Sequence, residues 1–322
     1  MMKWSTQEIN ILRQYENTNK KASDIYEQLS VNGYSRTLKA VRRKIESMRL
    51  GKPYKNLDIC NLPKILMLDI ETTPIPVWSW SLGNQYIQTH NMMKDADGKV
   101  IDWYVLSWSA KWLYDDEVLS DVLTSKEAID RNDERILQSA WRLLDEADII
   151  IAHNGDRFDL RKLKARFLAN NIMPPMPYKT VDTLKVARKE FALSSNKQDY
   201  ITKLLGVQEK LDTDFQLWLD CMNGDTEALK RMERYNKHDV IGLEQMYLKL
   251  RPYITSHPNI AIMMEENVCS SCGSDSLTNV GKYYYTGSSK YELYYCGGCM
   301  SPHIRGKSNM SEKNILIRPT AK

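Results

Sequence analysis

Two uninterrupted apolar runs in the middle of the chain predict strands that are buried on both faces. The first spans residues 65–68 and ends at an acidic pair, and the second spans residues 149–152. Short runs of this kind suit the central strands of a sheet that is covered by helices. A third apolar stretch, residues 103–113, indicates another strand of the same sheet and not a membrane element. The pattern predicts an α/β core.

Helical spacing dominates the segment from about Thr226 to Leu250. Apolar residues recur there mostly at intervals of three and four, which predicts one long helix. They are Leu229, Met232, Tyr235, Val240, Leu243, Met246, Tyr247 and Leu250. A turn at Asn154-Gly155 is expected to lead from the second apolar strand into another helix, which begins at Asp159.

Two further segments that contain aspartates are predicted to have structural roles. Asp182 precedes a helical stretch and is expected to cap it. The segment from Asp95 to Gly98 looks superficially like a calcium loop, but it lacks the further spaced ligands and the closing glutamate. It is predicted to be a hairpin turn between strands.

Acidic side chains stand at three of the predicted elements. Strand alternation places Asp69 and Glu71 on one side of their strand, about 6–7 Å apart along the backbone. Asp159 lies at a helix start, and Tyr235 and Asp239 are four residues apart on one helix face. Hard divalent cations such as Mg²⁺ prefer carboxylate oxygens and retain waters. These residues are candidates for a metal site. The simpler alternative is that Asp69 and Glu71 form an ordinary strand end, Asn154-Gly155 an ordinary turn, and Tyr235 and Asp239 an ordinary helix surface.

The order of these segments resembles the DEDD superfamily of 3′-to-5′ exonucleases, and the similarity spans residues 64–254. The family is named for four acidic residues in three motifs. The matching segments are Asp69-x-Glu71, His153-Asn154-x-x-x-Phe158-Asp159 and Tyr235-x-x-x-Asp239. A tyrosine four residues before the last aspartate is typical of the Tyr subclass, which includes the proofreading domains of DNA polymerases. The resemblance implies an RNase H-like fold, with a mixed sheet flanked by helices.

The resemblance also implies a role for each motif residue. Asp69 would bridge two Mg²⁺ or Mn²⁺ ions, Glu71 and Asp239 would complete the site that activates water, and Asp159 would support the second ion. Tyr235 would orient the attacking water by hydrogen bonding, since a phenol ordinarily titrates near pH 10. For contact with the substrate the candidates are His153, Asn154 and Phe158. For His153 and Asn154 a structural role in the turn is the alternative.

The N-terminal 50 residues predict three short helices. The first begins at a Ser/Thr cap after Trp4, the second covers residues 22–29, and the third covers residues 38–48. Three short helices with an early tryptophan resemble a Myb-like helix-turn-helix module. Its basic residues, expected to contact DNA, are Arg36, Lys39, Arg42, Arg43 and Lys44. A helical bundle with a solvated basic face, or a protein-docking module, remains the alternative.

Near the C-terminus, two Cys-x-x-Cys pairs are separated by 23 residues. Four thiolates in this pattern predict one structural Zn²⁺. The ligands are Cys269, Cys272, Cys296 and Cys299. The tyrosine-rich segment between the pairs suggests a hairpin, so the module resembles a zinc ribbon. Its tyrosines either stack on unpaired bases or complete the small core around the metal. His303 is a spare candidate ligand that four cysteines make unnecessary.

Charge and composition agree with several domains and a nucleic-acid partner. Residues 1–50 carry 10 Lys and Arg against 5 Asp and Glu, and residues 269–322 carry 7 against 3. Basic ends can hold a polyanion that an acidic core would repel. No apolar run of about 18 residues and no secretory signal pattern occurs. A soluble, cytoplasmic protein is expected, with no membrane partner. Its predicted parts are a helix-turn-helix module (1–50), a linker (51–63), a nuclease core (64–254), a second linker (255–267), a ribbon (268–306) and a tail (307–322).

The predicted activity is metal-dependent 3′-to-5′ hydrolysis of nucleic acid, DNA in preference to RNA, with release of nucleoside monophosphates. The sequence contains no polymerase segment, so a proofreading role would place the partner polymerase, or another replication or repair protein, on a separate chain. Two alternatives stay open. One is an RNA-trimming enzyme or a structure-selective endonuclease of the same fold. The other is a nucleic-acid-binding or transcription-regulatory protein that uses the fold as a scaffold.

Overall fold

The computed structural model describes residues 8, 11–12, 22–37, 40–41, 63–207, 211–286 and 289–304. The chain divides into two compact units. Residues 63–258 form one unit, and residues 1–62 together with 259–322 form the other. All three acidic segments belong to the first unit, and all four candidate zinc ligands belong to the second.

A five-stranded mixed sheet is the centre of the unit formed by residues 63–258. Its strand order is β3-β2-β1-β4-β5, with β2 antiparallel to both β1 and β3, and β4 parallel to both β1 and β5. The strands are β1 (Ile65–Thr72), β2 (Val105–Trp112), β3 (Leu119–Val122), β4 (Ile149–Ala152) and β5 (Lys179–Asp182). The predicted mixed α/β sheet is confirmed, including the strand that lies within residues 103–113.

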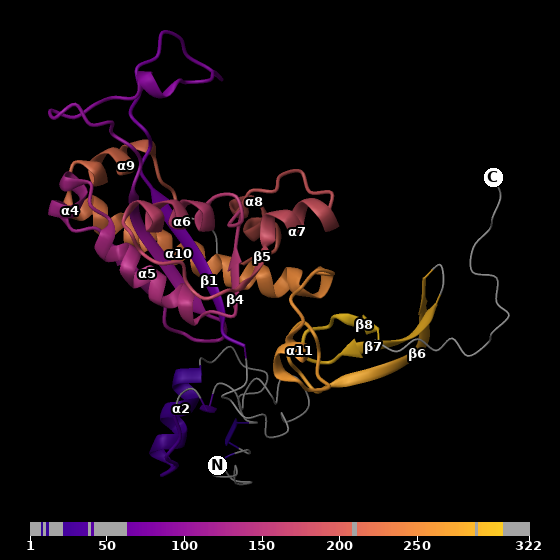
Figure 1. Cartoon of the computed structure of the whole chain (residues 1–322). Coiled ribbons are helices and arrows are strands. Elements are labelled where there is room, and N and C mark those ends of the chain that lie inside the picture. The colour runs from indigo at the N-terminus through magenta and orange to yellow at the C-terminus, as the bar shows by residue number, and fades with distance from the viewer. Residues whose placement is uncertain are drawn as a thin grey trace, which may run out of the picture. The chain divides into compact units, whose positions relative to one another are not determined.

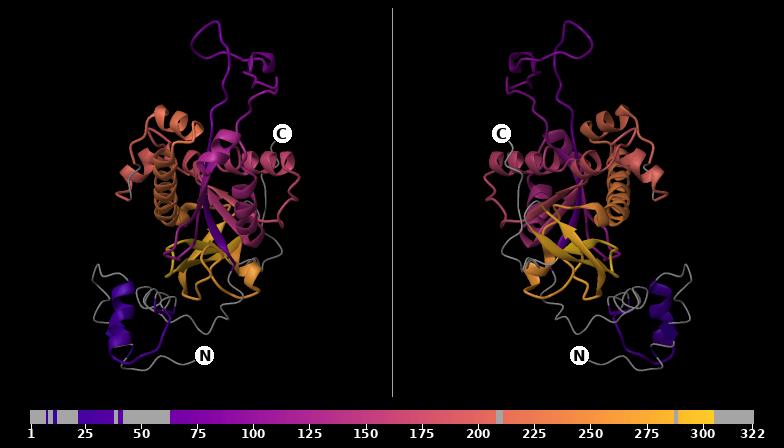
Figure 2. Two further views of the ribbon diagram at one scale, coloured as in Figure 1. Left: turned by 90° about the vertical axis from the view of Figure 1, so that its left-hand side faces the viewer. Right: turned by 90° about the vertical axis from the view of Figure 1, so that its right-hand side faces the viewer.

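Helices cover both faces of this sheet, as Figures 1 and 2 show. Alternate residues of β2 contact different helices. The Trp108 indole Nε1 donates to the Ile136 carbonyl of α5 (Glu134–Glu146), whereas the hydroxyl of the preceding residue, Ser107, donates to Asn236 of α10 (Thr226–Leu250). Because successive side chains of a strand point to opposite faces, α5 and α10 lie on opposite sides of β2.

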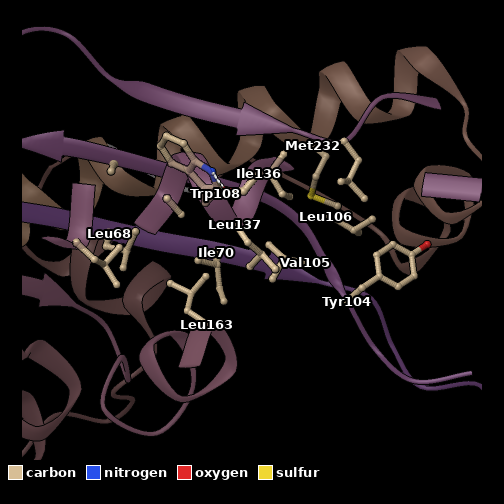
Figure 3. Close-up of a cluster of buried hydrophobic side chains, with 14 of the residues drawn as sticks. Leu68, Ile70, Tyr104, Val105, Leu106, Trp108, Ile136, Leu137, Leu163 and Met232 are labelled. Carbon is tan, nitrogen blue, oxygen red and sulfur yellow. Dashed lines mark hydrogen bonds between the residues drawn. The ribbon is translucent and has the colours of Figure 1, made fainter. Parts of the chain in front are cut away.

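The apolar core joins β1 and β2 to the helices, and Figure 3 shows part of it. Leu68 and Ile70 of β1 belong to this cluster together with Trp108 of β2 and Leu163 of α6 (Asp159–Ala169). Each is at most 4% exposed. Burial of a large apolar side chain contributes about 1.5–3 kcal/mol. The core therefore fixes β1, the strand that also carries Asp69 and Glu71.

Two buried ion pairs fix the helices against β2. The Asp133 carboxylate, at the start of α5, accepts from the Val105 amide (2.9 Å) and from the Arg166 guanidinium of α6 (2.6 and 2.8 Å). On the other face, the Lys111 ammonium pairs with the Glu244 carboxylate of α10 at 2.5 Å. A buried charge that loses its partner typically destabilises a protein by about 3–5 kcal/mol. The first pair joins α5 and α6 to β2, and the second holds α10 against the sheet.

The remaining helices of this unit are short, and of these the one that follows Asp182 was predicted from the sequence. They are α4 (Ser125–Asp130), α7 (Thr183–Glu190), α8 (Gln198–Leu204), α9 (Phe215–Met222) and the short 3-10 helices η2 (Thr89–Asn91) and η3 (Arg251–Tyr253). The Asp182 carboxylate caps α7 by accepting from the Leu184 amide (3.0 Å), as predicted. The predicted bounds of the long helix agree with those of α10. Within the described residues, no helix combines the length and the apolar character needed to cross a bilayer.

A long connection between β1 and β2, residues 73–104, extends away from the sheet (Figures 1 and 2). Its predicted turn is present, because the Gly98 amide donates to the Asp95 carbonyl (3.0 Å). The strands expected on either side are reduced to an isolated bridge between Lys94 and Val100. Within this connection, the Trp80 and Leu82 side chains are fully exposed.

The described part of the N-terminal segment contains α2 (Ala22–Val31), in agreement with the second predicted helix. Leu12, Ile25, Leu29 and Val41 form a small apolar cluster. Most of the first and third predicted helices lies outside the described residues, and so do four of the candidate DNA contacts, Lys39, Arg42, Arg43 and Lys44.

The described C-terminal segment contains α11 (Ile260–Met264) and a three-stranded antiparallel sheet (Figure 1). Its strands are β6 (Leu277–Tyr285), β7 (Lys290–Cys296) and β8 (Pro302–Ile304). β6 and β7 form the hairpin that the tyrosine-rich segment predicted, and β8 adds to the far side of β7. This segment is called the ribbon below.

Candidate active site

Three carboxylates from two elements converge in the unit formed by residues 63–258. Oxygens of Asp69 and Glu71, on β1, and of Asp239, on α10, all lie within 4.8 Å of one another. Asp69 and Glu71 pair across the ladder with Ser109 and Ser107, so they share the face of the sheet that α10 covers. Two short serine side chains opposite the carboxylates leave room for the approach of the helix.

Asn236 holds one of these carboxylates in place. Its side chain is fully buried, its amide nitrogen donates to Asp69 Oδ2, and its amide oxygen accepts from Ser107 Oγ at 3.3 Å. One side chain thus links β1, β2 and α10 beside the carboxylates. Asn236 was not predicted as a site residue, although it lies between Tyr235 and Asp239 of the third motif.

Asp159 lies next to β1 but does not belong to the group of three carboxylates. It is 3% exposed, and its Oδ1 accepts from the Ile70 amide at 3.1 Å. Burial raises the pKa of Asp159 to about 7, two backbone amides oppose that rise, and the negative charge of Asp182 adds to it. Because Ile70 lies between Asp69 and Glu71, the hydrogen bond to its amide fixes the backbone that carries both carboxylates.

A cleft of about 660 Å³ opens at the carboxylates. Its lining comes from β1, the end of β4, α7, α10 and the segment that leads into α8. The residues are Asp69, Glu71, His153, Asn154, Leu184, Arg188, Ser194, Ser195, Asn196, Lys197, Gln198, Asp199 and Asp239. Two exposed cations, Arg188 and Lys197, thus face the same cleft as the acidic group. Neither residue was predicted from the sequence, and the polar run around Lys197, just before a helix, is the signal that could have indicated it.

His153 and Asn154 line the cleft and also hold its wall together. The His153 ring Nε2 donates to the Asn196 carbonyl, and Nδ1 contacts the Thr183 hydroxyl, both at 3.0 Å. Asn154 has a φ of 68°, and its amide donates to the Asp182 carboxylate at 2.9 Å. A Cβ atom at Gly155 would lie 2.3 Å from the Ala152 Cβ, so the turn needs glycine there.

The two aromatic candidates lie outside the cleft lining. Phe158 is 37% exposed, and the Lys162 ammonium lies 5.3 Å from its ring centroid. Tyr235 is 4% exposed and belongs to the apolar core, where its ring meets Trp218 edge-on with centroids 6.2 Å apart. The Tyr235 ring is fixed by packing in the core. Asp239 lies one turn further along the same helix, so this packing also positions Asp239.

Arg36 is the one candidate DNA contact of the N-terminal segment within the described residues. Its guanidinium makes a two-point ion pair with the Glu8 carboxylate, at 2.6 and 2.9 Å. The side chain is 13% exposed. Arg36 therefore connects two parts of its own segment.

The three carboxylates of the cleft fit a divalent cation. Negative oxygens at such short separations repel one another, and a hard cation with a preference for oxygen ligands offsets that repulsion. Mg²⁺ usually takes one or two carboxylates and completes its shell with water and substrate phosphate. The donor set and the open cleft satisfy both requirements.

The four cysteines of the ribbon form a second candidate metal centre. Their sulfurs lie within 4.8 Å of one another, with Cys269 and Cys299 at 3.6 Å and Cys272 and Cys296 at 3.7 Å, and all four are free thiols. Tetrahedral Zn²⁺ with Zn–S distances of about 2.3 Å places neighbouring sulfurs about 3.8 Å apart. The set therefore fits Zn²⁺. His303 does not replace a cysteine; its Nε2 lies 3.1 Å from Cys269 Sγ.

Residues 110–251 match the family model of the RNase_H superfamily. The match runs from β2 to the end of α10, so it includes Asp159, Tyr235 and Asp239 and begins after Asp69 and Glu71. No curated protein matches the chain at a significant level. The match and the mixed α/β sheet support an RNase H-like superfamily domain, and with it hydrolysis of nucleic acid in general and the use of divalent metal ions.

Proposed function

We propose that the RNase H-like domain of this chain is a 3′-to-5′ exonuclease that hydrolyses phosphodiester bonds, with DNA as the preferred polymer. The observation that carries the proposal is the convergence of Asp69, Glu71 and Asp239 in an open cleft. The order of the three motifs along the chain supports the exonuclease class over other nucleases of this fold.

In this proposal, Asp69, Glu71 and Asp239 hold a pair of Mg²⁺ or Mn²⁺ ions, which when bound supply charge stabilisation at the attacking and leaving oxygens. Asn236 keeps the Asp69 carboxylate oriented toward the cleft. Asp159 binds the Ile70 amide of β1 and supports the second ion. The assignment of Tyr235 to the attacking water rests on the family resemblance alone, because its ring packs in the core outside the cleft lining.

The cations of the cleft bind the substrate backbone. In the part of the chain that the structure describes, neither the Arg188 guanidinium nor the Lys197 ammonium has an ion-pair partner, whereas Lys185 on the same helix as Arg188 pairs with Asp156 at 2.5 Å. A strand that enters an acidic site needs positive groups along its phosphates. Arg188 and Lys197 are assigned that role.

Replacing Arg188 and Lys197 together by Ala is expected to raise KM for a single-stranded 20-mer about tenfold and to leave kcat within about twofold, because phosphate contacts position the strand without entering the chemistry. The slope of log KM against log salt should fall by about one to two. Steady-state kinetics at several salt concentrations measure both values. Lys185→Ala is the matched control and should leave both unchanged. An unchanged salt slope in the double variant would remove the two cations from the substrate path.

Strand polarity tests the exonuclease class itself. A linear single-stranded DNA with a free 3′ end should be shortened stepwise, while the same sequence with a blocked 3′ end and a circular form should resist. Cleavage of the circle would assign an endonuclease, and faster cleavage of matched RNA would assign an RNA-trimming enzyme. Tight binding without cleavage of any form would favour the scaffold alternative. Any polymerase or repair partner is a separate proposal, which co-purification would test.

A further inference from the structure

The two faces of the ribbon sheet differ sharply in chemistry. Cross-strand partners share a face, and the register pairs Tyr284 with Tyr291 and Leu293 with Ile304. Tyr295 lies two residues beyond Leu293 on the same strand and therefore on the same face. This tyrosine face comprises Tyr284, Tyr291, Leu293, Tyr295 and Ile304, to which Thr278 and Pro302 add at the edges.

The tyrosine face is exposed and carries no charge. Tyr284 is 51% exposed, Tyr295 40% and Ile304 46%, and none of the seven residues just named is acidic or basic. The buried cluster of the ribbon consists of the four cysteines and Leu277. The tyrosines therefore do not complete the core around the metal centre, which was one of the two roles that the sequence left open.

The opposite face also exposes tyrosines, Tyr283 at 42% and Tyr285 at 68%, but it carries charged side chains beside them. The Lys290 ammonium lies 4.7 Å from the ring centroid of Tyr283, and the Tyr294 hydroxyl donates to the Glu292 carboxylate at 2.7 Å. Cys296 also belongs to this face. The opposite face therefore has tyrosines together with charged groups, whereas the tyrosine face has no charged group, and the opposite face can serve as a control.

We infer that the tyrosine face binds single-stranded nucleic acid by stacking on its bases. Every base has a π-face, so flat, uncharged aromatic surfaces bind unpaired strands with little sequence preference. The phosphates would meet the ammonium of Lys282, which is exposed and lies two residues before Tyr284 on β6. The inference rests on the proposed nuclease function, because that function makes a nucleic-acid strand the natural ligand of a second module.

The test uses the full chain with Asp69→Ala, so that bound DNA stays intact, and a fluorescein-labelled 30-nucleotide single-stranded DNA. Replacement of Tyr284 and Tyr295 together by Ala is expected to raise Kd at least about tenfold, since each base–aromatic stack contributes appreciably. Fluorescence anisotropy measures Kd. Tyr284→Phe with Tyr295→Phe should keep the affinity within about twofold, because the rings remain. Tyr283→Ala with Tyr285→Ala on the opposite face should also change it by less than about twofold.

An abasic strand of the same length separates stacking from charge. It should bind wild-type and Tyr284/Tyr295→Ala proteins equally, because it lacks bases to stack. Zinc content measured on every variant reports whether the ribbon is folded. If the double variant loses zinc, the single variant Tyr284→Ala, near the hairpin tip, tests the inference instead. Its Kd for the single strand is expected to rise about threefold or more. An unchanged Kd in zinc-loaded variants, or an equal loss for the opposite-face variant, would overturn the inference.

The binding assay does not depend on turnover. If the chain with an intact Asp69 cuts no nucleic acid while base-dependent binding through the tyrosine face persists, the proposed nuclease function fails and the inference stands. If cleavage occurs but binding ignores the tyrosine face, the inference fails and the nuclease function stands.

Discussion

Asp239→Asn is expected to lower kcat for hydrolysis of single-stranded DNA by about 10³-fold or more, with little change in DNA binding. Asp239 supplies the helix side of the three-carboxylate group, and its oxygen lies within 4.8 Å of those of Asp69 and Glu71. An amide of the same shape removes the negative charge that holds the cations. Loss of about 4 kcal/mol of transition-state stabilisation corresponds to a fall of about 10³ in rate.

The matched control is Glu227→Gln, which changes a carboxylate on the first turn of the same helix. Glu227 is exposed and pairs with Lys230 at 2.8 Å. Its loss should leave kcat within about twofold. Thermal unfolding should show that both variants fold, since Asn at position 239 keeps the volume of the side chain. If Asp239→Asn folds normally and keeps more than about a tenth of the wild-type kcat, the carboxylate group is not the catalytic centre.

Cys272→Ser is expected to lower bound zinc from about one ion per chain to nearly none and to unfold the ribbon. The buried cluster of the ribbon is made of the metal ligands and Leu277, so little apolar burial remains once the metal leaves. Binding of a structural Zn²⁺ supplies about 10–16 kcal/mol of folding free energy in comparable sites. Limited proteolysis should then cut within residues 268–304 and spare residues 63–258, whose apolar core is separate.

His303→Ala is the control for the ligand assignment. His303 contacts Cys269 Sγ and Ser270 Oγ, both at 3.1 Å, but four cysteines already fill a tetrahedral shell. The variant should keep a full equivalent of zinc. Full zinc in Cys272→Ser together with its loss in His303→Ala would replace the four-cysteine site by one that uses the histidine.

The elements predicted best from the sequence are those with a local periodic signal. The long helix α10 has apolar residues at helical spacing along its whole length, and the apolar strands β1 and β4 sit where buried runs occur. Asp182 caps α7 because a short polar side chain before a helix satisfies its first amides. None of these predictions requires knowledge of distant contacts.

Features that depend on distant contacts were missed. Asn236 bonds to Asp69 from 167 positions away, and its place inside the third motif does not by itself predict that contact. Arg188 and Lys197 reach the cleft because the wall formed by α7 and the following segment folds toward β1, and His153 secures that wall through Asn196. Asp159 begins its helix as predicted, yet its carboxylate binds the Ile70 amide and lies outside the group of three.

The connection between β1 and β2 shows a different limit. Residues 73–93 contain no Asp, Glu, Lys or Arg and have no helical or strand period, so no element could be assigned to them. The structure holds this segment by scattered backbone hydrogen bonds, such as that from the Trp78 amide to the Asn91 carbonyl at 2.8 Å. Such irregular pairing has no signature in sequence spacing.

The most direct test of the nuclease function is a time course on 5′-labelled single-stranded DNA and matched RNA with Mg²⁺ or Mn²⁺, comparing the wild-type chain with Asp69→Ala. A ladder that shortens from the 3′ end is expected for the wild type. It should disappear when the divalent ion is removed, return when the ion is restored, and be absent in the variant. Intact oligonucleotides under conditions in which a known exonuclease degrades them, or equal cleavage by both proteins, would contradict catalysis by the three carboxylates.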